Sequence, residues 1–313
     1  MLVTGVVMAC AAAELTVGTH RLPAQIPLSP DGSTAFVSVA NHVLVVDLAA
    51  GTITASITVG TSAERPAISP DGATLYVPNG GSNTVSVIDT AMGTVTATIP
   101  TPGGPSELAL SPDGSTGYLV DNGSNTVSVI STVTNTVTGT IAVGSRPIGA
   151  VVTPDGSKVY VTNALGNTVS VISAATSTVT ATISVGTAPR EIAVTPDGST
   201  VYASNLTGNS LSVIDTGTDT VTSTITGFSA PEAIAILTLP PAVTRVIPPG
   251  GSLAGGHKVT ITGTGFTGAT AVSFGGFPAA SFTVDSATQI TAGPAWSPEE
   301  WTARPRWVPH AVT

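Results

Sequence analysis

The chain of 313 residues is poor in charge and in cysteine and has no long apolar run, and each shortage excludes a class of protein. Charged residues make up 9% of the sequence, and 18 acidic against 9 basic residues give a net charge of -9. Nucleic acid requires a basic surface, so no nucleic-acid partner is expected. The single cysteine, Cys10, excludes an internal disulfide framework. The longest apolar stretch, residues 2–13, is too short for a transmembrane span.

Residues 1–13 form an apolar N-terminal segment that has two interpretations. Its apolar character and the run from Ala11 to Ala13 resemble a signal peptide with a cleavage site, although no Lys or Arg precedes them. Residues 7–10 also loosely resemble a lipobox. The alternative is an ordinary segment of a chain whose natural start lies further upstream.

The most informative pattern is a Ser/Thr-Pro-Asp-Gly turn that occurs five times. The turns begin at Ser29, Ser69, Ser111, Thr153 and Thr195, so the spacing is 40 residues once and 42 residues three times. A fixed period in this range is the signature of a repeat architecture. Because repeats mostly build a scaffold, function is expected where the repeats differ.

One repeat, residues 147–186, contains four short segments with the composition of β-strands. The expected strands cover residues 148–152, 158–163, 167–172 and 178–183. They are rich in Val, Ile and Thr, alternate with period two, and are bounded by Gly, Asn and Pro. Four antiparallel strands in about 42 residues are typical of one blade of a β-propeller.

Several segments resemble the YVTN family of β-propeller repeats. These are Tyr76–Asn79, Tyr160–Asn163 and Tyr202–Asn205, together with Asn-Thr-Val-Ser-Val-Ile at 83–88, 125–130 and 167–172. The resemblance covers about residues 14–239. The first unit departs from the pattern, because Phe36 replaces the Tyr and the turn before Val43 is two residues shorter.

We therefore expect an all-β fold that begins with a β-propeller of five full four-stranded blades over residues 14–239. A partial sixth blade is expected from the two ends of this region, Leu15–Gly18 as a fourth strand and Pro231–Ile236 as a first strand. The resemblance implies seven blades, which is more than this length supplies. A small closed ring and a fragment of a larger ring both remain open.

A different module is expected after the Pro-rich linker at 239–241. The run from Gly255 to Phe266 and the segments at 271–276 and 289–292 resemble an IPT/TIG domain, an immunoglobulin-like β-sandwich. The visible strands cover only part of such a domain, over residues 240–292. The tail, residues 293–313, holds all three tryptophans and is expected to be irregular. It is either out-of-frame or truncated sequence, or a native Trp-rich tail that packs on the sandwich.

The repeats differ in charge at the short loop before each first strand, where the channel of a propeller opens. The basic residues there are Arg21, Arg65, Arg146 and Arg190, and the acidic ones are Glu64, Glu107, Glu191 and Glu232. One interpretation is a rim of weak salt bridges between blades. The other is a recognition site that uses Arg forks for carboxylate, phosphate or sugar hydroxyl groups. Arg146 and Arg190 are the preferred ligand-binding candidates.

The sequence offers little that supports catalysis, and we predict no cofactor, no metal and no catalytic residue. The histidines His20, His42, His257 and His310 are scattered, and no nucleophile elbow, phosphate loop or dinucleotide fingerprint is present. First-strand interiors consist of Ala, Ile, Val, Leu and Gly. Two residues recur in every unit or nearly so and are interpreted as turn residues: the Asp at 31, 71, 113, 155 and 197, and the Asn at 83, 125, 167 and 209.

Low charge, abundant Thr and Ser and two modules typical of surfaces favour a bacterial secreted or cell-surface binding or adhesion protein. The propeller then acts as a recognition scaffold for a cell-wall or extracellular glycan or a protein, and the IPT/TIG domain as a spacer or adhesion module. This inference of function is an analogy that is based on the fold. One alternative is a propeller-type enzyme, such as a lactonase, a lyase or a cofactor-dependent oxidoreductase. The other is a gene fragment without independent activity.

Overall fold

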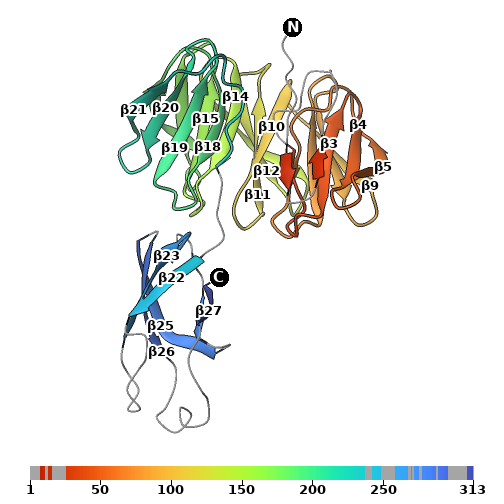
Figure 1. Cartoon of the computed structure of the whole chain (residues 1–313). Coiled ribbons are helices and arrows are strands. Elements are labelled where there is room, and N and C mark those ends of the chain that lie inside the picture. Colours follow the sequence, from red (N-terminus) through yellow and green to blue (C-terminus); the bar gives the residue numbers. More distant parts are fainter. Residues whose placement is uncertain are drawn as a thin grey trace. The chain divides into compact units, whose positions relative to one another are not determined.

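The computed structural model describes residues 26–236 without a gap, and outside this range residues 8–10, 13–15, 242–247, 258–266, 269, 271–274, 277–286, 288–294 and 309–312. All the regular elements of these residues are β-strands, as expected. The chain divides into two compact units, Met1–Ala235 and Ile236–Thr313, whose strands are labelled in Figure 1. No described segment is a helix long and apolar enough to cross a membrane.

Residues 26–236 form five antiparallel sheets, which we call blades 1 to 5 in chain order. The strands of blades 1 and 2 are β3 (Thr34–Val39), β4 (His42–Asp47), β5 (Thr52–Thr58), β6 (Ala67–Ile68), β7 (Thr74–Asn79), β8 (Thr84–Asp89) and β9 (Thr94–Pro100). Those of blades 3 and 4 are β10 (Pro105–Leu110), β11 (Thr116–Asp121), β12 (Thr126–Ser131), β13 (Thr136–Ala142), β14 (Pro147–Val152), β15 (Lys158–Asn163), β16 (Thr168–Ser173) and β17 (Thr178–Ser184). Those of blade 5 are β18 (Pro189–Val194), β19 (Thr200–Asn205), β20 (Ser210–Asp215) and β21 (Thr220–Thr226).

Blade 1 differs from the expected four strands, because its first strand is reduced to a single bridge between Leu28 and Ala35. Phe36 donates its N–H to the carbonyl of Pro27 at 3.1 Å, but Pro27 has no N–H to continue the ladder. Blades 2 to 5 have the four strands that the repeat predicts.

The partial sixth blade is not formed by the described residues. Pro231–Ile236 adopts no strand, and β1 (Met8–Cys10) pairs with β2 (Ala13–Leu15) in a separate two-stranded sheet. Residues 16–18 lie outside the described ranges. The reason is that a first strand obtains its ladder from the second strand of its own blade, and no Ser/Thr-Pro-Asp-Gly turn or second strand follows Ile236.

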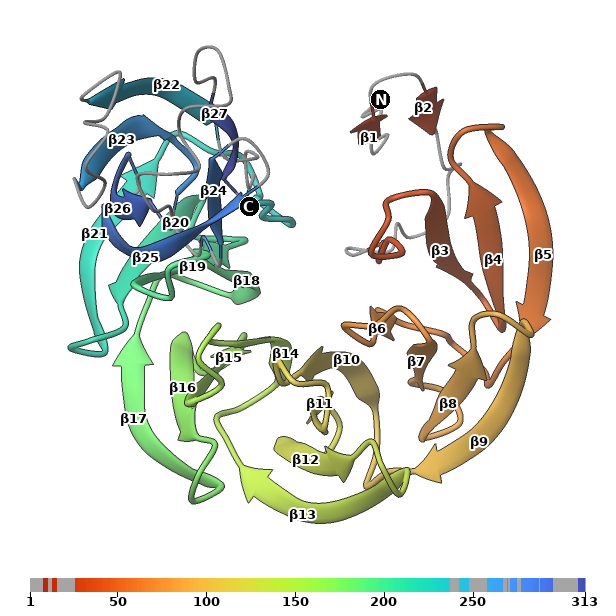
Figure 2. The same cartoon turned by 90° about the horizontal axis from the view of Figure 1, so that it is seen from below.

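Figure 2 looks along the propeller, with the first strand of blades 2 to 5 innermost and the fourth strand outermost. The period-two alternation sends neighbouring side chains of one strand into the cores on either side of the blade. Tyr160 and Val169 of blade 4 pack against Ile192 and Val201 of blade 5. Neighbouring blades thus bury their facing surfaces against each other, as a repeat architecture requires.

Each outer strand has a β-bulge with a threonine at the extra position. In blade 2, Val87 pairs with Ala97 and Ile88 pairs with Val95, so Thr96 is the extra residue. Its hydroxyl donates to the carbonyl of Val87 at 3.3 Å and satisfies a backbone acceptor beside the bulge. Four other blades repeat this bond, through Thr54, Thr138, Thr180 and Thr222.

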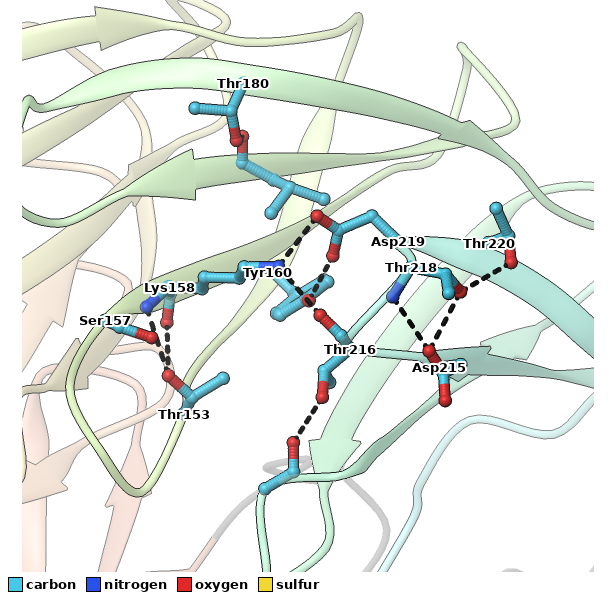
Figure 3. A network of polar contacts seen from close by, with 12 residues as sticks. Thr153, Ser157, Lys158, Tyr160, Thr180, Asp215, Thr216, Thr218, Asp219 and Thr220 are labelled. Atoms are coloured by element: carbon cyan, nitrogen blue, oxygen red, sulfur yellow. Dashed lines mark hydrogen bonds and ion pairs between the residues drawn. The ribbon is translucent and has the colours of Figure 1, made fainter.

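A polar network joins blades 4 and 5 away from the channel (Figure 3). Lys158 donates to the carbonyl of Thr216 at 2.7 Å and to Asp219 at 2.8 Å, and the Tyr160 hydroxyl donates to Asp219 at 2.5 Å. Burial, with the hydrogen-bonded carboxylate of Asp219 adding to it, raises the pKa of Tyr160. Every group in this network already has a partner, so it ties two blades together.

The second unit is one antiparallel sheet with the strand order β22-β23-β26-β25-β24-β27. Its strands are β22 (Ala242–Ile247), β23 (Val259–Thr264), β24 (Val272–Phe274), β25 (Phe277–Ser286), β26 (Gln289–Pro294) and β27 (Pro309–Val312). Val259, Ile261, Phe266 and Ile290 form its buried core. Strand β27 lies inside the segment expected to be irregular, where the free edge of β24 offers backbone groups for pairing.

Candidate functional site: the charged mouth of the propeller channel

The charged residues singled out from the sequence gather where the first strands begin, but not all of them lie in loops. Arg65 and Arg146 precede β6 and β14, as expected, whereas Glu107 lies within β10, and Arg190 and Glu191 lie within β18. The first strands therefore contribute two carboxylates to the channel. This corrects the expectation that their interiors supply only apolar residues.

At the centre, the guanidinium of Arg65 lies between two carboxylates from other blades. Its Nη1 atom is 2.5 Å from Glu107 Oε2 and 3.6 Å from Glu191 Oε2. Arg65 is 8% exposed, Glu107 1% and Glu191 2%. Burial alone lowers the pKa of Arg65, but the charges of Glu107 and Glu191 outweigh it, so this pKa is raised and the cation is held.

The three residues come from blades 2, 3 and 5, so their contact crosses the channel. The backbone helps to place them, because the Arg65 N–H donates to the carbonyl of Ser106 at 3.3 Å and the Glu191 N–H donates to the Ser204 hydroxyl at 3.0 Å. At Gly149 of blade 4, an added Cβ would lie 2.5 Å from the carbonyl oxygen of Arg190. The inner strands therefore approach too closely there for a side chain.

Further out, Arg190 and Glu232 form an exposed ion pair. Their atoms Nη1 and Oε1 are 2.8 Å apart, and the side chains are 22% and 67% exposed. Such a pair contributes little to stability, about 0–1 kcal/mol. Glu232 is exposed, and Arg190 is partly exposed beside it.

Arg146 is exposed and makes no ion pair with another described residue. Its backbone has a φ of 54°, a left-handed conformation that is uncommon for arginine. Its N–H donates to Asn125 Oδ1 at 2.7 Å, which holds this conformation.

Of the other charged residues expected at the channel mouth, Glu64 is half-buried, and Arg21 lies outside the described residues. The structure thus brings together Arg65, Glu107 and Glu191, and separately Arg190 and Glu232; no single alternating ring is formed by the described charges.

The two repeated polar positions have structural roles, in keeping with their interpretation as turn residues. Asp113 accepts the Ser111 hydroxyl at 2.5 Å and the Ser115 N–H at 3.1 Å, and these bonds lower its pKa to about 2. The side-chain Oδ1 of each recurring Asn accepts a hydrogen bond from a backbone N–H group at the start of the next blade. These bonds join Asn83 to Gly104, Asn125 to Arg146, Asn167 to Ala188 and Asn209 to Ala230.

One unusual residue was missed by the sequence analysis. The second strands of blades 2, 4 and 5 end in a fully buried Asn whose side-chain NH2 donates to a serine on the third strand, as Asn163 does to Ser170 at 2.9 Å. In blade 3 this position is Asp121, which accepts the Ser128 hydroxyl at 2.6 Å. Burial raises the pKa of Asp121 to about 6, against the opposing hydrogen bonds from Ser128. Aligning the repeats by their turns reveals the Asn-to-Asp difference.

Within the described ranges, no three His, Cys, Asp or Glu side chains lie close enough together to hold a metal ion. His42 is the one histidine of residues 26–236, and it begins β4 of blade 1.

The sheets and their converging first strands define a β-propeller, followed by a second β module. The family model "Lactonase, 7-bladed beta-propeller" matches residues 67–238, and an IPT/TIG domain model matches residues 241–302. The chain therefore belongs to this lactonase-type propeller family of YVTN-like repeats and carries an IPT/TIG domain. Both expected resemblances and the fold class are confirmed.

Many solved structures resemble the chain, including the following two. A chain of hydrazine synthase from Kuenenia stuttgartiensis is 28% identical, with a TM-score of 0.57 over 64% of this chain, and the match spans 65% of that chain's length. A functionally unknown protein from Desulfotomaculum acetoxidans is 18% identical, with a TM-score of 0.59 over 73% of this chain and 80% of that chain. The second similarity concerns the fold alone. No curated protein matches significantly.

Proposed function

We propose that the protein is a secreted or cell-surface binding protein whose propeller recognises an extracellular ligand at the channel mouth. The IPT/TIG domain serves as a spacer or adhesion module. The observation that carries this proposal is the contrast between two sets of charges. Arg65, Glu107 and Glu191 are buried and engaged with one another, whereas Arg146, Arg190 and Glu232 are accessible on the same end of the blades.

The ligand class follows from the chemistry of the accessible cations. A guanidinium presents a planar fork of donors that matches carboxylate, phosphate or paired sugar hydroxyl groups. The chain as a whole carries a net charge of -9, so anions are not drawn to it in general. A short-range contact with Arg146 and Arg190 is therefore the means of recognition, and acidic cell-wall or extracellular glycans are the first ligands to test.

Removing the two accessible arginines is expected to weaken ligand binding without unfolding the propeller. Alanine fits the backbone at position 146, because Ala188 and Ala230 occupy the equivalent left-handed positions with φ of 54° and 47°. We expect Arg146→Ala with Arg190→Ala to lower affinity by about 10-fold or more, which corresponds to one lost charge-assisted contact. The measurement is titration calorimetry against acidic and neutral glycans selected on an array.

Arg245→Ala is the matched control, because this exposed arginine lies on β22 in the other unit. Equal affinity of the double variant and the native protein would rule out a site at the mouth. A protein that melts cooperatively but binds no glycan or surface protein would instead favour a chain without independent binding activity.

A second candidate function is catalysis in the channel. The family's lactonase name, the hydrazine synthase similarity and the buried carboxylates of Glu107 and Glu191 favour it. We expect no lactone hydrolysis above background by the purified protein, with or without added divalent metals, because Glu107 and Glu191 are buried and already in contact with Arg65. Turnover that disappears in a folded Glu191→Gln variant would establish the enzyme instead.

A further inference from the structure

Each blade presents one apolar face to the blade that follows it, and this forward face is the same in every repeat. It consists of a tyrosine from the second strand, two residues of the third strand and an isoleucine of the fourth. The sets are Tyr76, Val85, Val87 and Ile99 in blade 2, Tyr118, Val127, Val129 and Ile141 in blade 3, and Tyr160, Val169, Val171 and Ile183 in blade 4. In all three blades the following blade covers this face.

The forward face of blade 5 has the same composition but is not covered. Its residues are Tyr202, Leu211, Val213 and Ile225, and the pairings Tyr202–Val213 and Leu211–Ile225 place them side by side on one face. Ile225 is 43% exposed, whereas Ile99, Ile141 and Ile183 are 0%, 5% and 6% exposed. Tyr202, Leu211 and Val213 are each partly exposed as well. An apolar stripe with the composition of the interface between two blades is therefore partly exposed to solvent.

Within the propeller unit, the described residues do not supply a cover for this face. Pro231–Ile236, which follows blade 5, forms no strand. The opposite face of blade 1 is already occupied, because Ala35, Val37 and Val46 are at most 3% exposed. A head-to-tail contact between copies, blade 5 on blade 1, is therefore blocked. What remains available on a second copy is the same forward face of its own blade 5.

We propose that this chain forms a two-fold symmetric dimer in which the forward faces of two copies of blade 5 pack on each other. Such a contact buries the same kinds of side chain that blades 2 to 4 bury against the blade that follows, but here two forward faces meet each other. None of its four residues is charged, so the face is free of the repulsion that a net charge of -9 creates elsewhere on two approaching copies. Two-fold symmetry closes the assembly with one kind of contact, the commonest arrangement of homo-oligomers.

Tyrosine supports the same contact, because it combines a large apolar ring with a polar end suited to interfaces. In blade 4 the equivalent Tyr160 donates its hydroxyl to Asp219 of the next blade. The Tyr202 hydroxyl forms no hydrogen bond with another described residue.

Sedimentation of the full chain across a wide concentration range tests the proposal. We expect the native protein to reach twice its mass of 30.8 kDa and to dissociate on dilution. Ile225→Lys places a charge at the centre of the contact and is expected to raise the dissociation constant by about 30-fold or more, the effect of a strong interface residue. Its melting temperature at low concentration stays unchanged, because Ile225 is partly exposed in the monomer.

Ile53→Lys is the matched control, because this isoleucine on β5 is also exposed, at 61%, but lies far along the chain in blade 1. It is expected to dimerise like the native protein. A native protein that stays monomeric at all concentrations, or an Ile225→Lys variant that dimerises normally, overturns the proposal. An Ile225→Lys variant that unfolds also overturns it, since the face is then covered from within the same chain.

Discussion

Replacing Asp121 by Asn is expected to stabilise the propeller above pH 6 by about 2–3 kcal/mol, the free energy that corresponds to a pKa raised from 3.8 to about 6. The physical reason is that Asp121 is fully buried in a site that holds Asn in three other blades. An amide donates to the facing serine without carrying charge. A carboxylate at this position loses its hydration and gains the hydrogen bonds of Ser128 in return.

The sign of the pH dependence follows from the direction of the shift. Between pH 3.8 and about 6 the folded protein holds a proton on Asp121 that the unfolded chain has released. Stability therefore falls as the pH rises through this window and levels off above it. The gain from Asp121→Asn is expected to be full at pH 7.5 and small below pH 4, as measured by urea unfolding at a series of pH values.

The reverse substitution in another blade provides the control. Asn163 donates to Ser170 at 2.9 Å and to Thr168 at 3.1 Å, whereas Asp can only accept from these hydroxyls, as Asp121 does from Ser128, and adds a buried charge. Asn163→Asp is therefore expected to destabilise at pH 7.5 and to recover on acidification. If the stability difference between each variant and the native protein does not change with pH, Asp121 is solvated in solution.

The repeat and its blades could be predicted because their causes are local. The Pro-Asp-Gly turns fix the hairpins, the period-two pattern fixes the faces, and the recurring Asn sets the blade entries. Pro231–Ile236 does not form the strand expected of a sixth blade, because its pattern matches a first strand but its ladder depends on a partner strand. The local sequence pattern indicates that a segment tends to form a β-strand, but the strand forms only where a partner strand is available for hydrogen bonding.

The charged site could be predicted only in part, because its pairings depend on blades that are distant in sequence. The sequence favours Arg146 and Arg190 over Arg65, because Arg65 has Glu64 beside it. Its closest partners are in fact Glu107, one repeat later, and Glu191, three repeats later. Only the curvature of the propeller brings these positions together across the channel (Figure 2). Arg65 is consequently part of the buried interior of the propeller. The candidate binding residues are the charged residues that lie outside this buried cluster.

That assignment predicts a large loss of stability when Arg65 is replaced. Arg65→Met keeps much of the apolar side-chain volume but removes the cation that lies between Glu107 and Glu191. Removing one member of a buried ion pair leaves charge that water does not reach, and the expected loss is about 3–5 kcal/mol in the free energy of unfolding. The measurement is urea unfolding, with an unchanged m-value showing that the folded state stays compact.

Two further variants show how much of the loss in Arg65→Met comes from the carboxylates left buried without their cation and how much from the loss of the arginine side chain. Arg146→Met makes the same change at an exposed position and is expected to alter stability by no more than about 0.5 kcal/mol. Adding Glu107→Gln to Arg65→Met removes one of the two carboxylates, so the double variant is expected to recover a substantial part of the loss. The resulting coupling energy measures the Arg65–Glu107 interaction itself. If Arg65→Met is as stable as Arg146→Met, water reaches the channel centre, and Arg65 returns to the group of accessible cations from which a ligand site is built.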